Sequence, residues 1–158
     1  MENYMKEAER MRCVGYARSA VTGEYAQDPT EAQAEEIRQE CRPFRLLEVL
    51  QEPGRSGNDL DRPQLKKLLR MVRRGRVDAV VVAKLAALSR SPRQFDDLMR
   101  QFKRHGVRLI SVKDGINTAI PAGKAKIDAI RTLARTLRTL DGHRRAREYG
   151  ASIQARCA

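Results

Sequence analysis

The stretch VDAVVVA, residues 77–83, decides the fold class, because it is the most hydrophobic run of the chain and has the length of one strand. Four of its seven residues are valines, whose branched side chains favour extended backbone. An apolar run without polar alternation predicts a strand that is covered on both faces. Residues 77–83 are therefore expected at the centre of a parallel sheet.

Shorter apolar runs and helical patterns alternate on both sides of this strand. The apolar runs cover residues 11–17, 45–50 and 107–112, and the helical patterns cover residues 29–41, 63–74, 92–105 and the segment from 124 onward. Asp28, Asp61 and Ser91 are predicted to cap the first three helices, each of which starts with a proline. The alternation predicts parallel strands joined by crossover helices.

The length of 158 residues suits one domain better than two. We predict a single three-layer α/β domain, with a mostly parallel sheet of four to five strands flanked by helices and with a long C-terminal helix. The expected divisions are an N-terminal extension (1–10), a catalytic-type domain (11–123), and an oligomerisation or DNA-contacting helix with a basic tail (124–158).

Positive charge is concentrated in the second half of the chain. The whole sequence carries 32 Lys and Arg against 20 Asp and Glu, a formal net charge of +12. Acidic residues outnumber basic ones only in the first 62 residues. Such an uneven distribution indicates a polyanion partner, although composition alone fits a solvated basic surface equally well.

Several classes of protein are disfavoured by composition. Aromatic residues make up only 4% of the chain, too few for the stacking platforms of a single-strand binder. The chain has no apolar run of the roughly 20 residues that a membrane span requires, and residues 1–12 are too polar for a signal peptide. Cys13, Cys41 and Cys157 lack metal-ligand spacing. We expect a cytoplasmic protein without a metal or cofactor.

Four short motifs follow the predicted strands. They are GYAR (15–18), GRSG (54–57) leading to LDRP (60–63), KLAALSR (84–90), and DGINT (114–118) with PAG (121–123). All four fall where open α/β sheets place their sites. In this order and spacing they resemble the catalytic domain of serine site-specific DNA recombinases of the resolvase and invertase type, and Glu31-Ala32-Gln33 also fits that pattern.

The resemblance implies a serine hydroxyl that attacks a DNA phosphodiester and forms a phosphoseryl link. Arginines would stabilise the charge that develops on phosphorus, because phosphoryl transfer depends mainly on positioning and electrostatics. The family arginines carry over to Arg18, Arg62 and Arg90, which are expected to form a phosphate-binding pocket.

Three other family positions differ in this chain. The position of the nucleophilic serine holds Ala20, and an aspartate and an arginine of the third motif are replaced by Ala86 and Ala87. A methyl group cannot form the covalent link to phosphorus. These losses predict a catalytically inactive domain.

Ser19 is the alternative nucleophile, since a slip of one residue would bring its hydroxyl to the position of Ala20. Neighbouring residues of a strand face opposite sides, which argues against such a slip. The slip would also leave Ala86 and Ala87 unchanged. Ser56 and Ser89 are predicted to be hydrogen-bonding residues of turns and loops.

The last helix has an apolar stripe followed by basic residues. The stripe consists of Ile127, Ile130, Leu133, Leu137 and Leu140, which either pack on the sheet or pair with another subunit. Gly142 is expected to break or fray the helix. The predicted DNA-contacting residues are Lys124, Lys126, Arg144, Arg145 and Arg147, with a solvated tail as the alternative for the last three.

The resemblance implies double-stranded DNA as a partner, bound mainly through phosphates. It also implies a homo-oligomer, a dimer or a tetramer, or a mixed oligomer with an active recombinase that the chain would regulate. Two other functions are alternatives to this one. One is an active recombinase that works through Ser19, and the other is a nucleotide-binding module, for which the sequence has no P-loop or dinucleotide motif.

Overall fold

The computed structural model describes residues 2–20, 29–59 and 61–157. Its sheet has five strands in the order β2-β1-β3-β4-β5, of which the first four are parallel and β5 is antiparallel to β4. The strands are β1 (Arg12–Arg18), β2 (Arg45–Glu52), β3 (Ala79–Val82), β4 (Arg108–Ser111) and β5 (Ile116–Asn117). The predicted α/β class and the central position of the valine-rich strand are confirmed.

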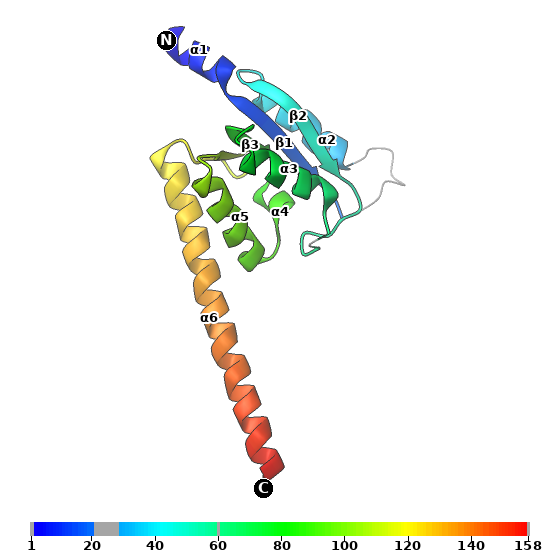
Figure 1. Cartoon of the computed structure of the whole chain (residues 1–158), viewed down its shortest axis with the longest axis vertical. Helices are drawn as coiled ribbons and strands as arrows, with labels where there is room; N and C mark the ends of the chain where they lie inside the picture. The colour runs from blue at the N-terminus through cyan, green and yellow to red at the C-terminus, as the bar shows by residue number, and fades with distance from the viewer. Residues whose placement is uncertain (1, 21–28, 60, 158) are drawn as a thin grey trace.

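Helices cover both faces of the sheet (Figure 1). They are α1 (Glu2–Arg10), α2 (Pro29–Glu40), α3 (Pro63–Arg73), α4 (Leu85–Leu88), α5 (Pro92–Arg104) and α6 (Pro121–Cys157). One face packs against α2, where Ile37 and Cys41 meet Cys13 and Ala17. The opposite face packs against α3 and α5.

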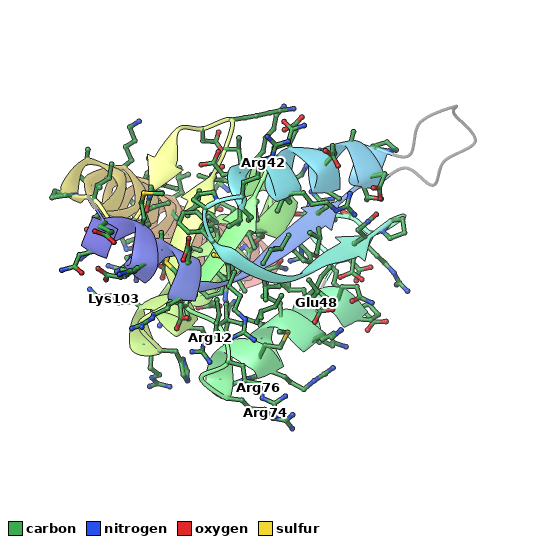
Figure 2. The ribbon with its side chains drawn as sticks, turned by 90° about the horizontal axis from the view of Figure 1, so that it is seen from above. Arg12, Arg42, Glu48, Arg74, Arg76 and Lys103 are labelled. Carbon is green, nitrogen blue, oxygen red and sulfur yellow. The ribbon has the colours of Figure 1, made fainter. Side chains whose placement is uncertain are left out.

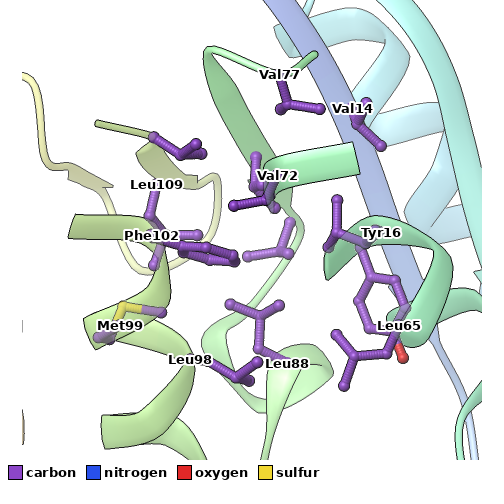
Figure 3. Close-up of a cluster of buried hydrophobic side chains, with 14 of the residues drawn as sticks. Val14, Tyr16, Leu65, Val72, Val77, Leu88, Leu98, Met99, Phe102 and Leu109 are labelled. Atoms are coloured by element: carbon purple, nitrogen blue, oxygen red, sulfur yellow. The ribbon is translucent and has the colours of Figure 1, made fainter. Parts of the chain in front are cut away.

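The larger core lies between the sheet and the helices α3 and α5 (Figure 3). Val14 and Tyr16 of β1 enter this core, whereas Cys13 and Ala17 enter the core beside α2. The side chains of β1 therefore alternate between the two faces along the whole strand, as the pleat of a strand requires. This alternation decides which side chains at the end of β1 reach the candidate site.

The helix caps follow the sequence predictions in part. The Ser91 side chain accepts a hydrogen bond from the backbone N–H of Gln94, so its role as N-cap of α5 is confirmed. The prediction for Asp61 is wrong, because Arg62 is the N-cap residue of α3 and Asp61 instead accepts a 2.8 Å bond from Lys66 Nζ. Asp28 lies outside the described residues.

The helix α6 is continuous over 37 residues and runs through Gly142. The expected break at this glycine does not occur, because a cost of about 1 kcal/mol is small beside the hydrogen bonds of the flanking turns. At about 1.5 Å per residue α6 is roughly 55 Å long. It packs beside α5 and then extends well beyond the rest of the domain (Figure 1).

Three short elements were not predicted from the sequence. The segment 1–10 was expected only as an extension and contains α1, while α4 and β5 lie in segments for which no helix or strand was predicted. Among the described helices, none combines the length and the apolarity that a membrane span needs.

Candidate functional site at the carboxyl edge of the sheet

The candidate site lies where β1, β2 and β3 end. Arg18 is the last residue of β1, a loop that begins at Pro53 follows β2, and α4 lies just beyond β3. Because these parallel strands all run toward the same edge, their terminal residues converge there. Three of the four sequence motifs meet at this edge.

The Arg18 side chain is buried, with 5% of its surface exposed, and it donates to three backbone carbonyls. Its Nε bonds Ala87 O at 3.0 Å, its Nη2 bonds Ala86 O at 2.6 Å, and its Nη1 bonds Arg55 O at 2.9 Å. The guanidinium thus ties the end of β1 to α4 and to the loop after β2. Arg18 is a structural brace of the site as well as a positive charge in it.

Arg62 is the largest of the fully buried side chains, with 1% exposed. Its Nη1 lies 3.5 Å from the Tyr16 hydroxyl oxygen and 3.4 Å from Ala87 O, so both bonds are long. Within the described part of the chain, its Nε has no hydrogen-bond partner. A buried guanidinium with incomplete hydrogen bonding is suited to accept an anion.

Arg90 joins Arg18 around Gly57. A Cβ added to Gly57 would lie 2.8 Å from Cγ of Arg90 and 2.9 Å from Nη2 of Arg18, so only glycine lets the two arginines approach this loop. Burial lowers the pKa of Arg18, and the positive charges of Arg62 and Arg90 lower that pKa further. The structure therefore brings the three sequence-predicted arginines together as one cluster.

Ser19 lies beyond the end of β1 and keeps that strand's pairing. Its N–H donates to Glu52 O at 3.2 Å, and its carbonyl accepts from Arg55 N at 3.0 Å. Arg18, two residues after Tyr16, lies on the same face of the sheet as Tyr16, toward α3 and α4. The register between β1 and β2 is continuous up to the pair of Arg18 and Glu52, so β1 is not shifted by one residue at this end.

The three alanines lie around the same cluster. Ala20 is exposed beside the end of β1, Ala86 is exposed on α4, and Ala87 is 4% exposed. Through their carbonyls, Ala86 and Ala87 hold the guanidinium of Arg18, and Ala87 also receives Arg62. Their backbones shape the site, while their side chains bring no charge to it.

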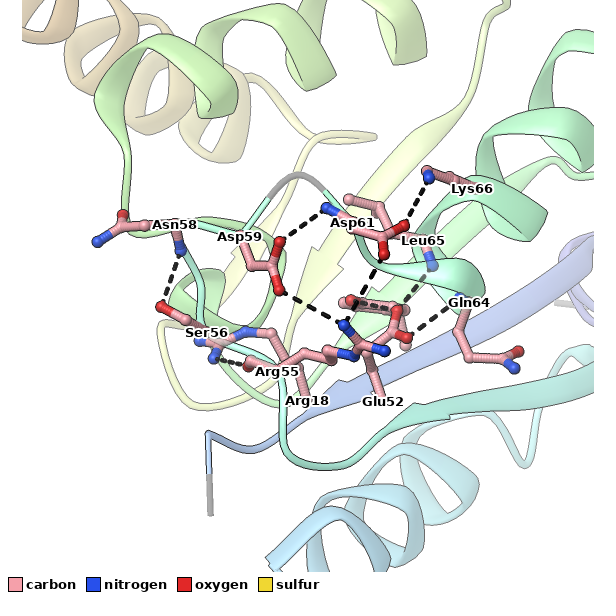
Figure 4. Close-up of polar contacts among 11 residues, drawn as sticks. Arg18, Glu52, Arg55, Ser56, Asn58, Asp59, Asp61, Gln64, Leu65 and Lys66 are labelled. Atoms are coloured by element: carbon pink, nitrogen blue, oxygen red, sulfur yellow. Dashed lines mark hydrogen bonds and ion pairs between the residues drawn. The ribbon is translucent and has the colours of Figure 1, made fainter. Parts of the chain in front are cut away.

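Three residues that support the arginines, Glu52, Tyr16 and Gln33, were not singled out for these roles from the sequence. Figure 4 shows Glu52 beside Gln64 and Leu65. Glu52, 3% exposed, accepts the Tyr16 hydroxyl at 3.2 Å and the N–H groups of Gln64 and Leu65 at the start of α3. Burial raises the pKa of Tyr16, which keeps its hydroxyl a donor. Gln33 bonds both the N–H and the carbonyl of Arg18.

Polar residues of the loops fix the surrounding backbone. The Ser89 hydroxyl lies 3.4 Å from Gly57 O and accepts from Ser91 N at 3.0 Å. The Ser56 hydroxyl accepts from Asn58 N at 3.2 Å. Both serines therefore act as hydrogen-bonding residues of loops, as predicted.

The predicted DNA-contacting residues on α6 are not part of the arginine cluster. Lys124 and Lys126 are exposed near the start of α6, and Arg144, Arg145 and Arg147 are exposed on the part that extends away from the domain. They add positive charge along the helix rather than at the carboxyl edge.

The apolar stripe of α6 is mostly open. Ile127 is buried, whereas Ile130, Leu133, Leu137 and Leu140 are 37%, 60%, 45% and 59% exposed. Ile130, Leu133 and Leu137 also line a groove of about 350 Å³ between α6 and the segment from α4 to the start of α5, together with Ala86 and Arg90. Most of the stripe thus does not pack on its own sheet.

The comparisons with known proteins agree with the fold just described. The family model described as "Resolvase, N terminal domain" matches residues 13–154. A DNA-invertase of Enterobacteria phage P7 is 38% identical over 93 residues, which are 59% of this chain and 49% of the relative. The transposon Tn917 resolvase of Enterococcus faecalis is 33% identical over 79 residues, which are 50% of this chain and 42% of the relative.

Solved structures show the same fold. The N-terminal catalytic domain of TP901-1 integrase superposes with a TM-score of 0.75 at 23% identity, over 82% of this chain and 98% of that one. A resolvase family site-specific recombinase from Streptococcus pneumoniae gives a TM-score of 0.73 at 21% identity, over 93% and 99%.

The five-stranded sheet with its long C-terminal helix has the architecture of a serine recombinase catalytic domain. The match of the family model covers most of the chain, and the chain belongs to the resolvase family of serine recombinases. It spans about half the length of the two sequence relatives named above.

Proposed function

We propose that this chain is a resolvase-type domain that binds double-stranded DNA but does not cleave it. The cluster of the buried Arg18 and Arg62 with the exposed Arg90 would hold a backbone phosphate, and the basic part of α6 would lie along the duplex. Guanidinium groups suit this role because they pair with phosphate oxygens through two parallel bonds.

The observation that carries the proposal is the register at the end of β1. Arg18 pairs with Glu52 and the backbone of Ser19 continues that pairing, so Ser19 directly follows the arginine and does not take the place of Ala20. The family position of the nucleophile is Ala20, which has no oxygen to attack phosphorus.

We further propose that the chain self-associates through α6, as a dimer or a tetramer, or joins an active recombinase in a mixed oligomer and so regulates recombination. The four exposed apolar residues of the stripe support this role, since they recur at the spacing of a helix-pairing seam.

The test is to incubate the protein with duplex DNA that contains a recombination site and with a nicked suicide version of it. We expect a salt-sensitive complex without a phosphoseryl adduct in the mass spectrum. An adduct on Ser19 that disappears in Ser19→Ala would overturn the proposal in favour of an active recombinase.

Restoring the family residues is the matched experiment. Ala20→Ser alone, and then with Ala86→Asp and Ala87→Arg, adds back the hydroxyl and the two charged side chains. Nicking that appears only with Ala20→Ser would show that the missing oxygen limits the reaction. Because Ala87 is buried, the thermal melting temperature of each variant should be measured alongside.

A further inference from the structure

A second cavity, of about 410 Å³, lies where the start of α6 packs against α5 and β4. It is separate from the arginine cluster and from the groove that Leu133 and Leu137 line. Its volume falls in the range of about 300–1,000 Å³ that small-molecule sites occupy. Because residues of α5, β4 and α6 line it, the cavity is a product of the fold rather than of one segment.

The inner wall of this cavity is apolar. It includes Met99 and Phe102 of α5, Leu109 of β4 and Ile127 of α6, and each of these side chains is at most 5% exposed. Figure 3 shows Met99, Phe102 and Leu109 within the larger core. Polar groups that are buried against such a wall without hydrogen bonds cost free energy, so a ligand in this place needs an apolar body.

A guanidinium group also lines the cavity. Arg131 of α6 has only 9% of its side-chain surface exposed, and its Nε donates to Oδ1 of Asp96 at 2.8 Å. Among the described residues, its two Nη groups have no hydrogen-bond partner. Unpaired donors on a buried cation are costly, and two neighbouring Nη groups match the two oxygens of a carboxylate. Arg131 is therefore suited to receive an anion from the cavity.

Two exposed lysines add positive charge to the lining, Lys103 in the last turn of α5 and Lys124 in the first turn of α6. Figure 2 looks onto the end of the molecule at which α6 begins and shows Lys103 at its edge. Neither lysine forms an ion pair within the described part of the chain. The helix dipole favours Lys103 but disfavours Lys124, so the fold alone does not explain Lys124. Asp128 is the one acidic residue in the lining.

We propose that this cavity binds a small organic carboxylate with an apolar body, of the class of aliphatic or aromatic monocarboxylic acids. The carboxylate would accept bonds from the two Nη groups of Arg131, and the body would lie against Phe102 and Leu109. Lys103 and Lys124 would attract the anion to the cavity. This site goes beyond the proposed function and does not depend on DNA binding.

Other ligands match only one of the two features. An inorganic anion, or a phosphate of the DNA backbone, has no apolar body to cover Phe102 and Ile127. A neutral apolar molecule would leave the Nη groups of Arg131 without acceptors. The apolar wall and the buried guanidinium together select a molecule that is charged at one end and apolar at the other.

Such a ligand would contact α5, β4 and α6 at once. The ion pair of Arg131 with Asp96 already joins α6 to α5, and the ligand would add a contact between α6 and β4. A molecule that binds only the folded state stabilises it in proportion to its occupancy. We therefore expect the carboxylate to raise the melting temperature of the chain.

The test titrates the full chain with four probes: octanoate, octanamide, octylamine and acetate. The first three share one apolar body and differ in the charge of the head group, whereas acetate has the charge without the body. We expect saturable binding of octanoate, at least about tenfold tighter than that of the other three, because bonds between charged partners are worth about 1.5–3 kcal/mol. Equal affinities for octanoate and octanamide, or no binding of octanoate, would overturn the proposal.

The position of the bound probe is read from backbone amide shifts in nuclear magnetic resonance spectra. Octanoate should move the signals of Phe102, Leu109 and Ile127. Shifts confined to Leu133 and Leu137 would place the probe in the other groove and overturn the proposal. The experiment contains no DNA, so its failure would leave the proposed function intact.

Two variants test the cavity itself. Ala119→Leu enlarges an exposed residue of the lining, and Ala129→Leu makes the same change at an exposed position of α6 outside it. Arg131→Lys keeps a cation beside Asp96 but lacks the paired Nη groups. We expect weaker octanoate binding in Ala119→Leu and Arg131→Lys and wild-type binding in Ala129→Leu, with melts that verify folding. Ala119→Leu keeps the test decisive if Arg131→Lys does not fold, and unchanged octanoate affinity in Ala119→Leu would contradict the assigned site.

Discussion

Nε of Arg131 lies 2.8 Å from Oδ1 of Asp96, and this ion pair fastens the long helix α6 to α5. Both side chains are buried, with 9% and 2% of their surfaces exposed. Arg135 and Arg100 approach the same carboxylate at 3.4 Å from the surface. One buried carboxylate of α5 thus holds α6 through two of its arginines, Arg131 and Arg135.

Asp96→Asn should destabilise the domain by about 3 kcal/mol, because it leaves Arg131 buried without its counter-charge. Urea unfolding measures this loss, and limited proteolysis reports whether α6 detaches. Asp97→Asn is the control, since Asp97 is about half exposed and its ion pair in the described residues is with the exposed Arg100. Equal stability of the Asp96 and Asp97 variants would contradict this role of Asp96.

The stability that Asp96 contributes should depend on pH. Burial opposes its charged form, but the bond from Arg131 and the nearby Arg135 hold the pKa of Asp96 below its usual value. A carboxylate whose pKa is lower in the folded state contributes its full stabilisation at pH values above its unfolded pKa of about 3.9. This stabilisation is lost as the pH falls through the pKa of the folded state. The melting-temperature difference between wild type and Asp96→Asn should therefore be constant near neutral pH and shrink below about pH 4.

Arg18→Lys should cost about 2–3 kcal/mol of unfolding free energy. A single ammonium group cannot reach the three carbonyls that Arg18 bonds in different directions, and bonds from charged donors are worth about 1.5–3 kcal/mol each. Arg90→Lys, on an exposed side chain, should change stability by less than about 0.5 kcal/mol. Comparable losses in the two variants would argue against Arg18 as a brace.

Leu133→Ser with Leu137→Ser should shift an oligomer toward the monomer, because the change replaces apolar contacts of the exposed stripe with hydroxyls. Light scattering after size-exclusion chromatography measures the mass at several concentrations. Thr136→Ser with Thr139→Ser alters exposed positions of the same helix outside the stripe and should leave the mass unchanged. A wild-type protein that stays monomeric at high concentration would refute pairing through this stripe.

Gly123→Ala should destabilise the domain by about 1–3 kcal/mol even though alanine favours helices. A Cβ at position 123 would collide with the backbone oxygen of Asn117, so the start of α6 would have to move away from β5. Gly142→Ala is the matched control on the same helix. Nothing lies within 4 Å of its added Cβ, and we expect a gain of up to about 1 kcal/mol in thermal or urea unfolding.

Much of the fold follows from local patterns in the sequence. The valines of β3 and the proline-led starts of α2, α3 and α5 predict elements that the structure contains, because burial and helix-start preferences act over a few residues. β5 has only two residues, and α4 only four, too few for any periodicity. The pairing of Arg12 with Asp78 depends on neighbouring strands and has no local signal.

The candidate site was predictable to a similar extent. The motifs identified Arg18, Arg62 and Arg90, but the three carbonyls that occupy Arg18 could not be read from side-chain identities. The buried Glu52 follows the apolar run 45–50 in the sequence and ends β2, a position at which an exposed acid would be equally ordinary. Its role emerges only from the nearness of Tyr16 and the start of α3.

Because α6 is unbroken through Gly142, the helix fixes the direction in which Arg144, Arg145 and Arg147 extend relative to the rest of the domain. Each residue of a helix turns the chain by about 100° and advances it by about 1.5 Å. One residue inserted after Leu140 would therefore rotate these three guanidinium groups by about 100° around the helix axis. An insertion of seven residues would return them to nearly the same direction from the axis, about 10 Å farther from the domain.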